Sequence, residues 1–260
     1  MADLADRLLG CYASAVHDVL RVMGYGNQVL PPTIRALDPT KRVAGEIYTI
    51  SGHIDQTLSR HETLLRWSRV LSRVPGGKVL VCQPNTKAVA LMGELSAQAL
   101  TVKDTRGYVV DGHCRDTDFI LDMGFPVFCE LNTPADIVER WTYDALGEPV
   151  TIGTVTVRSG DWLIGDRDGV VIIPGEIAEE VAKAAADARL REQLMAAIVQ
   201  ARKRATLAGA PPPTAKELHA AVSEPLHALP PTSLAAVKKC MSLLVAMQRA
   251  GTKPQPAAGE

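Results

Sequence analysis

Three charged residues in the middle of the chain are of types that could act together on a small anionic substrate. Glu94 opens a stretch that closes with the adjacent pair Arg115 and Asp116. An arginine offers a planar fork that can hold a carboxylate by two parallel hydrogen bonds. An aspartate offers hard oxygen, which suits a magnesium-type ion that keeps several waters. The three residues suggest one anion-and-metal site, although an isolated Arg-Asp step is common and mostly carries no function.

The elements predicted around these residues place them where strands end. The segment GYVVDG predicts a strand, and Arg115-Asp116 follow it closely. Ligands of open α/β sheets bind beyond the carboxyl ends of the strands. The GEL segment at 93–95 lies where a loop after a strand meets a helix, whose backbone N–H groups can hold a second anionic oxygen. Such a site would bind an α-keto acid. The guanidinium would bind its carboxylate, and the metal would polarise its carbonyl.

Strand and helix patterns alternate over the first 140 residues, which predicts an α/β fold with a largely parallel central sheet. After residue 140 the chain is β-rich, with hairpin-type turns expected at Arg158–Asp161 and Asp166–Gly169. One long alanine-rich helix, or two, then follow. The earlier helices are expected over 2–23, 55–73, 87–101 and 116–123, and the strands at RVAGEIYTISG, KVLVCQP, GYVVDG and FPVFCEL.

The length and the composition define the expected domains. A chain of 260 residues suggests one domain, or one domain with an appendage. The composition becomes proline-punctuated near residue 210, so we expect an α/β domain over 1–205 and an extension over 206–260. We expect the extension to dock on the body or on a neighbouring subunit.

Charge and cysteine content exclude several classes of protein. The 28 basic and 29 acidic residues give a formal net charge of −1, which offers no global case for a nucleic-acid partner. The five cysteines form no CxxC pair, which disfavours a disulfide framework or a cysteine zinc site and fits a reduced, cytoplasmic setting. The first residues lack a signal-peptide pattern, and no apolar run is long enough to span a bilayer, so we expect no membrane partner.

The charged stretch and its flanks resemble the family of the regulator of ribonuclease E activity A and its relatives, the 4-hydroxy-4-methyl-2-oxoglutarate aldolases. That family is marked by an acidic residue, twenty intervening residues and then Arg-Asp. Here residues 95–114 separate Glu94 from Arg115-Asp116. The resemblance covers roughly residues 5–205 and includes SAVHDVL, VAGEIYTI, GYVVDGHCRD, GFPVFCE and GDWLIGDRDGVVIIP.

The resemblance implies a fold, an assembly and an activity. The fold would be an α/β/β/α sandwich of the swivelling phosphohistidine-domain type, assembled as a homotrimer or hexamer with active sites at subunit interfaces. The activity would be that of a metal-dependent class II lyase that uses Mg²⁺ or Mn²⁺. Such an enzyme cleaves a 4-hydroxy-2-oxo acid, decarboxylates oxaloacetate, or does both, through the enolate of pyruvate.

The resemblance also implies roles for individual residues. Arg115 would bind the keto-acid carboxylate and stabilise the enolate, and Asp116 would hold the metal, largely with waters. Glu94 would contact the waters of the metal or orient a catalytic water. Leu95 and Ser96 would lend backbone amides. The residues expected to contact substrate are Arg115, Gly93, Leu95 and Ser96.

A further glutamate is expected from the neighbouring subunit, near the C-terminal end of the family core. Glu192 is our candidate for this catalytic role, and its rivals are Glu176, Glu179 and Glu180. Glu130 departs from the basic or small residue that relatives often carry, and we expect it to alter the distal part of the substrate pocket.

Two other functions stay open beside the lyase. One is a non-catalytic regulator that binds a ribonuclease or another protein partner, as the namesake of the family does. The other is a pathway-specific lyase or hydratase that uses the same enolate-stabilising site. Cys114 stands next to Arg115, yet nothing near it in the sequence marks it as an activated nucleophile.

Overall fold

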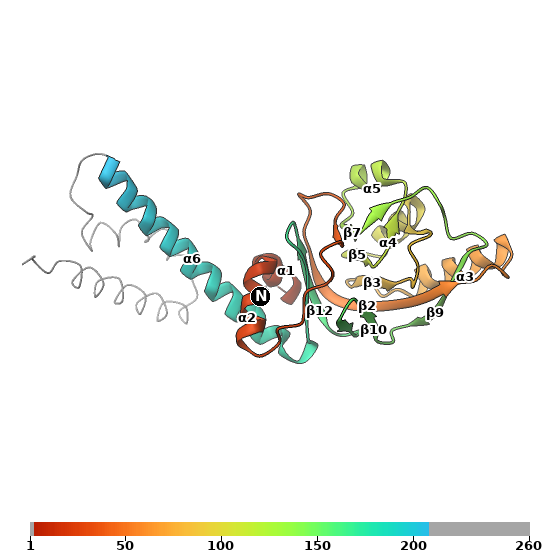
Figure 1. The fold of residues 1–260 in the computed structure, drawn as a ribbon, viewed down its shortest axis with the longest axis horizontal. Coiled ribbons are helices and arrows are strands. Elements are labelled where there is room, and N and C mark those ends of the chain that lie inside the picture. The colour runs from red at the N-terminus through yellow and green to blue at the C-terminus, as the bar shows by residue number, and fades with distance from the viewer. Residues whose placement is uncertain (1–2, 208–260) are drawn as a thin grey trace, which may run out of the picture. The chain divides into compact units, whose positions relative to one another are not determined.

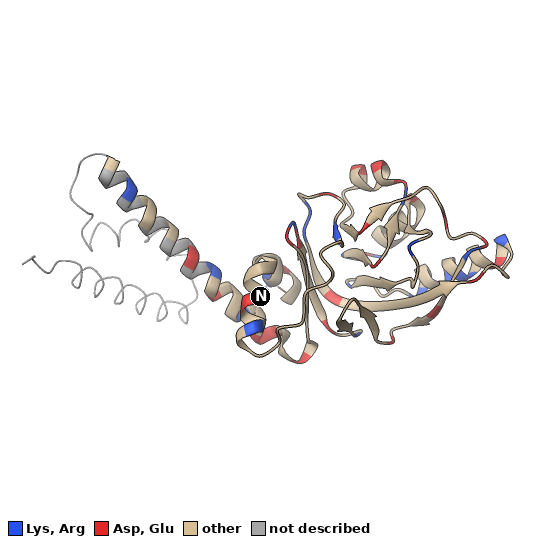
Figure 2. Ribbon diagram, viewed as in Figure 1, with Lys and Arg blue, Asp and Glu red and all other residues tan. Residues whose placement is uncertain are grey.

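The computed structural model describes residues 3–207 (Figure 1). The chain divides into two units, Met1–Ala185 and Ala186–Glu260. The predicted extension over 206–260 lies almost wholly outside the described residues, so the predicted boundary stays a prediction. Basic and acidic residues are interspersed along the described chain (Figure 2).

A mixed sheet forms the centre of the first unit. Strands β2, β3, β5 and β7 pair in parallel, whereas β1, β9, β12 and β13 join antiparallel. The prediction of a largely parallel sheet therefore holds only for its middle. The strands are β1 (Arg35–Ala36), β2 (Val43–Ile54), β3 (Val79–Gln83), β5 (Gly107–Val110), β7 (Val127–Cys129), β9 (Trp141–Leu146), β12 (Trp162–Asp166) and β13 (Gly169–Ile173).

The two edges of this sheet approach each other, so that it forms a nearly closed barrel. The segment before β1 pairs with β13, since the Leu30 amide donates to the Val170 carbonyl at 3.0 Å. The side chain of Arg35, on β1, donates to the Asp168 carbonyl in the β12–β13 turn at 2.8 Å. These bonds satisfy strand edges that would otherwise be left open. The more specific assignment to the swivelling phosphohistidine type stays a prediction.

Successive side chains of the strands face opposite sides, as the period of two requires. Val79, Val81, Val109 and Phe128 pack inside the barrel with residues of β12 and β13. Their neighbours pack outward against the helices. Helices α3 (Arg60–Arg73), α4 (Glu94–Val102) and α5 (Thr117–Met123) cover β3, β5 and β7, while α1 (Leu4–Leu9), α2 (Ala13–Val22) and the start of α6 (Ala178–Leu207) cover β12 and β13.

Several predicted helix bounds differ from the structure. The helix expected over 2–23 is broken at Gly10, and the Leu9 carbonyl at the break accepts a 2.8 Å hydrogen bond from Arg42. The helix expected over 55–73 begins only at Arg60, because Ser59 and Glu62 form a capping box there. The helix expected from 87 begins at Glu94, after the short strand β4 (Ala90–Met92).

One of the two predicted hairpins is correct. β12 and β13 pair across the turn Asp166–Gly169 as expected. The turn Arg158–Asp161 instead leads from one sheet to another, because β11 (Val155–Val157) pairs with β10 (Val150–Ile152) in a separate two-stranded sheet. A short 3₁₀ turn, η1 (Gly175–Ile177), precedes the single helix α6. Within residues 3–207, no helix combines the length and the apolar character that crossing a bilayer requires.

Phe128 fills the interior of the barrel and is fully buried. We expect Phe128→Ala to lower the free energy of unfolding by about 3–5 kcal/mol, the usual cost of emptying a phenylalanine site in a core. Phe119→Ala is the control, because that ring is 57% exposed on α5 and should change stability by only about 0.5 kcal/mol. Urea titration of both variants measures the difference. Equal costs would contradict the assignment of Phe128 to the core.

Candidate active site

A small parallel sheet brings the predicted site residues together. Strands β4, β6 (His113–Cys114) and β8 (Leu131–Asn132) follow β3, β5 and β7 along the chain and pair in the same order. Met92 pairs with Cys114, so the residues that follow β4 and β6 emerge side by side. Between Glu94 and Arg115 the chain forms helix α4 and strands β5 and β6, which bring Arg115 back beside the end of β4.

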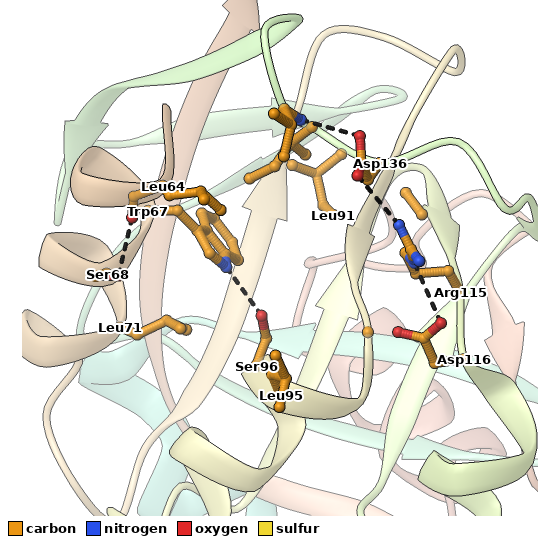
Figure 3. Close-up of a pocket in the computed structure, with 14 residues that line it drawn as sticks. Leu64, Trp67, Ser68, Leu71, Leu91, Leu95, Ser96, Arg115, Asp116 and Asp136 are labelled. Carbon is orange, nitrogen blue, oxygen red and sulfur yellow. Dashed lines mark hydrogen bonds and ion pairs between the residues drawn. The ribbon is translucent and has the colours of Figure 1, made fainter. Parts of the chain in front are cut away.

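Three acidic and basic side chains meet at these strand ends (Figure 3). The Arg115 guanidinium lies between two carboxylates: its Nε is 3.2 Å from Asp116 Oδ1, and its Nη1 is 3.4 Å from Asp136 Oδ2. The other Asp116 oxygen, Oδ2, accepts a 3.2 Å hydrogen bond from the Glu94 backbone amide. A carboxylate at a helix N-terminus is stabilised by the free N–H groups and the helix dipole, and here the helix is α4.

Asp136 is a site residue that was not predicted from the sequence. Its other carboxylate oxygen, Oδ1, accepts a 3.1 Å hydrogen bond from the Val138 amide, which fixes the side chain in the loop after β8. Its position in the chain could have indicated it as a site residue. Asp136 follows β8, the third strand of the parallel set β4, β6 and β8, and Glu94 and Arg115 follow the first two.

Asp116 has an uncommon backbone conformation. Its φ of 51° and ψ of 40° lie in the left-handed region, directly before α5. A non-glycine residue seldom adopts these angles, and aspartate is one of the few types that tolerate them. Residues held in such conformations gather at functional sites, where the surrounding contacts hold them in place. Here those contacts are the bonds to Arg115 and to the Glu94 amide.

Gly93 allows the strand ends to approach closely. A Cβ atom at this position would lie 2.6 Å from Asp116 Oδ2 and 3.0 Å from Arg115 Cγ. Its φ of −141° is ordinary extended backbone, so the need for glycine comes from the space and not from the backbone angle. The site therefore depends on the absence of a side chain as well as on the charged residues.

These residues border a cavity of about 460 Å³. The charged side of the cavity carries Arg115, Asp116 and Asp136, while α3 supplies apolar side chains to the facing side (Figure 3). Arg115 and Asp116 also line an adjoining hollow of about 240 Å³ with Asn132 and Thr133. The two charged residues thus lie between two open spaces, and a small ligand can reach them.

Five of the predicted site residues line the larger cavity, and two do not. The side chain of Glu94 accepts a 3.0 Å hydrogen bond from Gln98, so in this structure the residue contributes to the site through its backbone. Glu192 is exposed on α6 and belongs to the second unit, and its assignment stays a prediction. The predicted residues that line the cavity are Gly93, Leu95, Ser96, Arg115 and Asp116.

Glu130 lines neither of these two hollows, so its expected effect on the distal part of a substrate pocket stays a prediction. It forms a 2.9 Å ion pair with Lys87 and accepts a 2.8 Å hydrogen bond from the Thr33 hydroxyl. Burial disfavours its charge, yet the bonds from Lys87 and Thr33 outweigh burial and hold the pKa of Glu130 below its usual value. Its role in this structure is to join separate segments of the chain.

Cys114 is fully buried beside the site. A hydrogen bond with Cys129 and burial together raise the pKa of the Cys114 thiol well above its usual value. A thiol that stays protonated at neutral pH is a poor nucleophile. Cys114 therefore lacks the lowered pKa of an activated nucleophile.

The fold and the site define the class to which the protein belongs. The family model described as "RraA-like: Aldolase/RraA" matches residues 13–172, which include the whole of the site described above. The chain belongs to this RraA-like family. The family includes proteins named as aldolases and proteins named as ribonuclease inhibitors.

Individual relatives are distant. Protein DlpA from Legionella pneumophila is 27% identical over 198 residues, which is 74% of this chain and only 31% of that protein. A protein from Halalkalibacterium halodurans, named "Putative 4-hydroxy-4-methyl-2-oxoglutarate aldolase", is 26% identical over 66% of this chain and 80% of its own length. The crystal structure of Streptomyces coelicolor RraAS2, titled "an unusual member of the RNase ES inhibitor RraA protein family", is 27% identical, with a TM-score of 0.65 over 75% of this chain and 96% of that chain.

The close approach at Gly93 can be tested by substitution. We expect Gly93→Ala to displace the Asp116 carboxylate from the Glu94 amide and to lower the free energy of unfolding by about 1–2 kcal/mol. The control is Gly26→Ala, an exposed position with nothing within 4 Å of the added Cβ. Urea titration should show little change for the control. An unchanged midpoint for Gly93→Ala would contradict the tight contact between the strand ends.

Proposed function

We propose that this protein is a metal-dependent carbon–carbon lyase that acts on 2-oxo acids through the enolate of pyruvate. Its reaction is the retro-aldol cleavage of a 4-hydroxy-2-oxo acid, the decarboxylation of oxaloacetate, or both. The observation that carries this proposal is the Arg115 guanidinium, held between Asp116 and Asp136 at the N-terminus of α4 and open to a cavity. The relatives named as aldolases support the same conclusion.

Arg115 is placed to bind the carboxylate of a 2-oxo acid. Its two ion pairs engage Nε and Nη1, and Nη2 carries two further N–H donors. Because Asp116 and Asp136 fix the plane of the guanidinium, little side-chain entropy is lost when a substrate binds. The same positive charge favours the negative charge that develops on the substrate oxygen as the carbon–carbon bond breaks.

The N-terminus of α4 can assist this binding. The first N–H groups of a helix have no partner inside the helix. The backbone amides of Leu95 and Ser96, in the first turn of α4, can therefore donate hydrogen bonds to a second substrate oxygen. Both residues line the cavity, and the Ser96 hydroxyl accepts a 2.9 Å hydrogen bond from Trp67 Nε1. That bond ties the first turn of α4 to α3 and so keeps the amides in place.

Asp116 suits a magnesium-type ion better than a zinc-type ion. Among residues 3–207, no cluster of three or more His, Cys, Asp or Glu side chains is arranged to hold a metal. Zinc usually needs three or four protein ligands, whereas Mg²⁺ binds through one or two carboxylates and keeps its waters. Asp116 would therefore hold Mg²⁺ or Mn²⁺, mostly with waters and substrate. When bound, the ion would draw electron density from the substrate carbonyl and so ease enolate formation.

The two proposed reactions differ in one proton. Retro-aldol cleavage removes a proton from the 4-hydroxyl group, and decarboxylation of oxaloacetate does not. We propose Glu94, through an oriented water, or Glu192 from a neighbouring subunit of a homotrimer or hexamer, as the group that handles this proton. Oxaloacetate therefore tests enolate stabilisation alone, without the proton acceptor.

A regulatory role is the alternative, and the RraAS2 relationship favours it. A protein that only binds a ribonuclease has no need for an arginine placed between two carboxylates beside a cavity. The two functions are separated by assaying metal-dependent pyruvate release and, in parallel, the binding of the full chain to a ribonuclease E fragment. Binding without turnover would favour the regulator.

The proposed role of Asp116 is tested by pyruvate release from oxaloacetate, measured in a coupled assay with Mg²⁺, with chelator, and after Mn²⁺ is restored. We expect chelator and Asp116→Ala each to remove the enzyme-dependent rate. Asp118→Ala is the matched control, because Asp118 is an exposed aspartate on α5 two residues away. Release that survives both chelator and Asp116→Ala would refute the proposed role of Asp116.

Arg115 can be tested by a substitution that keeps its charge. Lysine cannot reproduce the planar fork, so we expect Arg115→Lys to lower kcat/KM for oxaloacetate by at least about a hundredfold. Arg140→Lys, at an exposed position outside the cavity, should leave kcat/KM unchanged. If Arg115→Lys keeps near-normal kcat/KM, the assignment of Arg115 to the substrate carboxylate is wrong.

A further inference from the structure

We infer that the substrate carries an apolar group, and not a second carboxylate, on the carbons beyond C4. This inference rests on the proposed function and specifies the class of 2-oxo acid that fits the cavity. The observation behind it is the face that α3 presents opposite Arg115, where Leu64, Trp67 and Leu71 line the cavity (Figure 3). Ser68 lines it too, but its hydroxyl donates to the Leu64 carbonyl of its own helix at 2.8 Å. We refer to Leu64, Trp67 and Leu71 as the α3 wall.

The α3 wall presents carbon to the cavity. Trp67 is 8% exposed, and its one polar atom, Nε1, is already bonded to the Ser96 hydroxyl at 2.9 Å. The Trp67 ring also packs edge-on against Trp141, with ring centroids 5.9 Å apart, which fixes its orientation. Leu64 lines the cavity and is 43% exposed overall, so its side chain has surface that a ligand can cover. Ile137 and Val138 also contribute to the apolar lining of the cavity.

The charges of the cavity disfavour a second carboxylate. Within the described part of the chain, Arg115 is the only Lys or Arg that lines the cavity, where it faces the carboxylates of Asp116 and Asp136. A substrate with one carboxylate can use this guanidinium. A second carboxylate placed against the α3 wall would lose its hydration without gaining a cation from the described residues of this chain, which is costly.

The arginines of α3 do not supply the missing cation. The arginines of α3 are exposed and do not line the cavity: Arg60, Arg66, Arg69 and Arg73. Arg66 Nη1 instead donates to the Thr142 hydroxyl at 3.3 Å. The helix therefore turns leucine and tryptophan toward the cavity and its arginines elsewhere.

The size of the cavity also leaves space for a distal group. A volume of about 460 Å³ lies within the range of cavities that hold drug-sized ligands, and a three-carbon 2-oxo acid needs far less. Each methylene group buried on the α3 wall should tighten binding about fourfold. A 2-oxo acid with an alkyl or aryl end can use this surface, and pyruvate or oxaloacetate alone cannot.

The first test is binding and does not require turnover. 2-Oxohexanoate and 2-oxoglutarate share the 2-oxo acid head, but 2-oxohexanoate ends in an alkyl group and 2-oxoglutarate ends in a carboxylate. Neither has the 4-hydroxyl group needed for retro-aldol cleavage. We expect isothermal titration of the full chain with Mg²⁺ to give at least about tenfold tighter binding for 2-oxohexanoate. Equal binding, or tighter binding of 2-oxoglutarate, would overturn the inference.

The second test moves a cation into the α3 wall. We expect Leu64→Lys to shift the ratio of the two dissociation constants at least about tenfold toward 2-oxoglutarate. Leu65→Lys is the matched control, because Leu65 is 42% exposed on the same helix and does not line the cavity. It should leave the ratio unchanged. If Leu64→Lys shifts the ratio no more than Leu65→Lys does, the distal group does not contact the α3 wall.

Oxaloacetate separates failure of this inference from failure of the proposed function. It has no carbon beyond C4, so its decarboxylation reports on Arg115 and Asp116 alone. Metal-dependent turnover of oxaloacetate together with a preference for 2-oxoglutarate would overturn only the inference about the distal group. No turnover of oxaloacetate and no binding of either 2-oxo acid would overturn the proposed function, and the inference with it.

Discussion

The Asp116 carboxylate holds the site together, because it joins two strand ends through two different contacts. One oxygen pairs with the adjacent Arg115 just after β6, and the other accepts a hydrogen bond from the Glu94 amide at the start of α4. These contacts need the parallel register of β4 and β6, a left-handed backbone at Asp116 and a glycine at position 93. Each of these requirements is energetically unfavourable by itself. Together they hold the Arg115 guanidinium in one rigid position at the rim of the cavity.

Much of this site could be predicted from the sequence, because adjacent parallel strands end at one edge and charged residues follow two of the ends. The remainder depends on tertiary structure. Asp136 joins Arg115 from a loop that has no periodic pattern, and the side chain of Glu94 bonds to Gln98 instead of entering the cavity. The closure of the barrel was not predictable either, since it depends on pairing between residues 28–30 and β13, which are far apart in the sequence.

The proposed chemistry and the proposed specificity come from different parts of the chain. Arg115 and Asp116 follow β6, and the amides of α4 follow β4, so the groups proposed to act on the 2-oxo acid head all lie at strand ends. The α3 wall comes from a different part of the chain, and a hydrogen bond from Trp67 to Ser96 joins it to the first turn of α4. Changes in α3 could therefore alter the distal group that is accepted without altering the charged cluster. Such a division suits a family whose members carry names as different as aldolase and ribonuclease inhibitor.

The most direct test of enolate chemistry is the exchange of the methyl protons of pyruvate with solvent in D₂O, followed by proton NMR. This exchange requires the enolate and is independent of any distal group or leaving group. If Arg115 and a metal at Asp116 stabilise that enolate, the methyl signal will decay with the wild-type chain and a divalent cation, and will persist with Arg115→Lys or with chelator. A methyl signal that persists with folded, metal-supplied wild-type protein would contradict the proposed lyase chemistry.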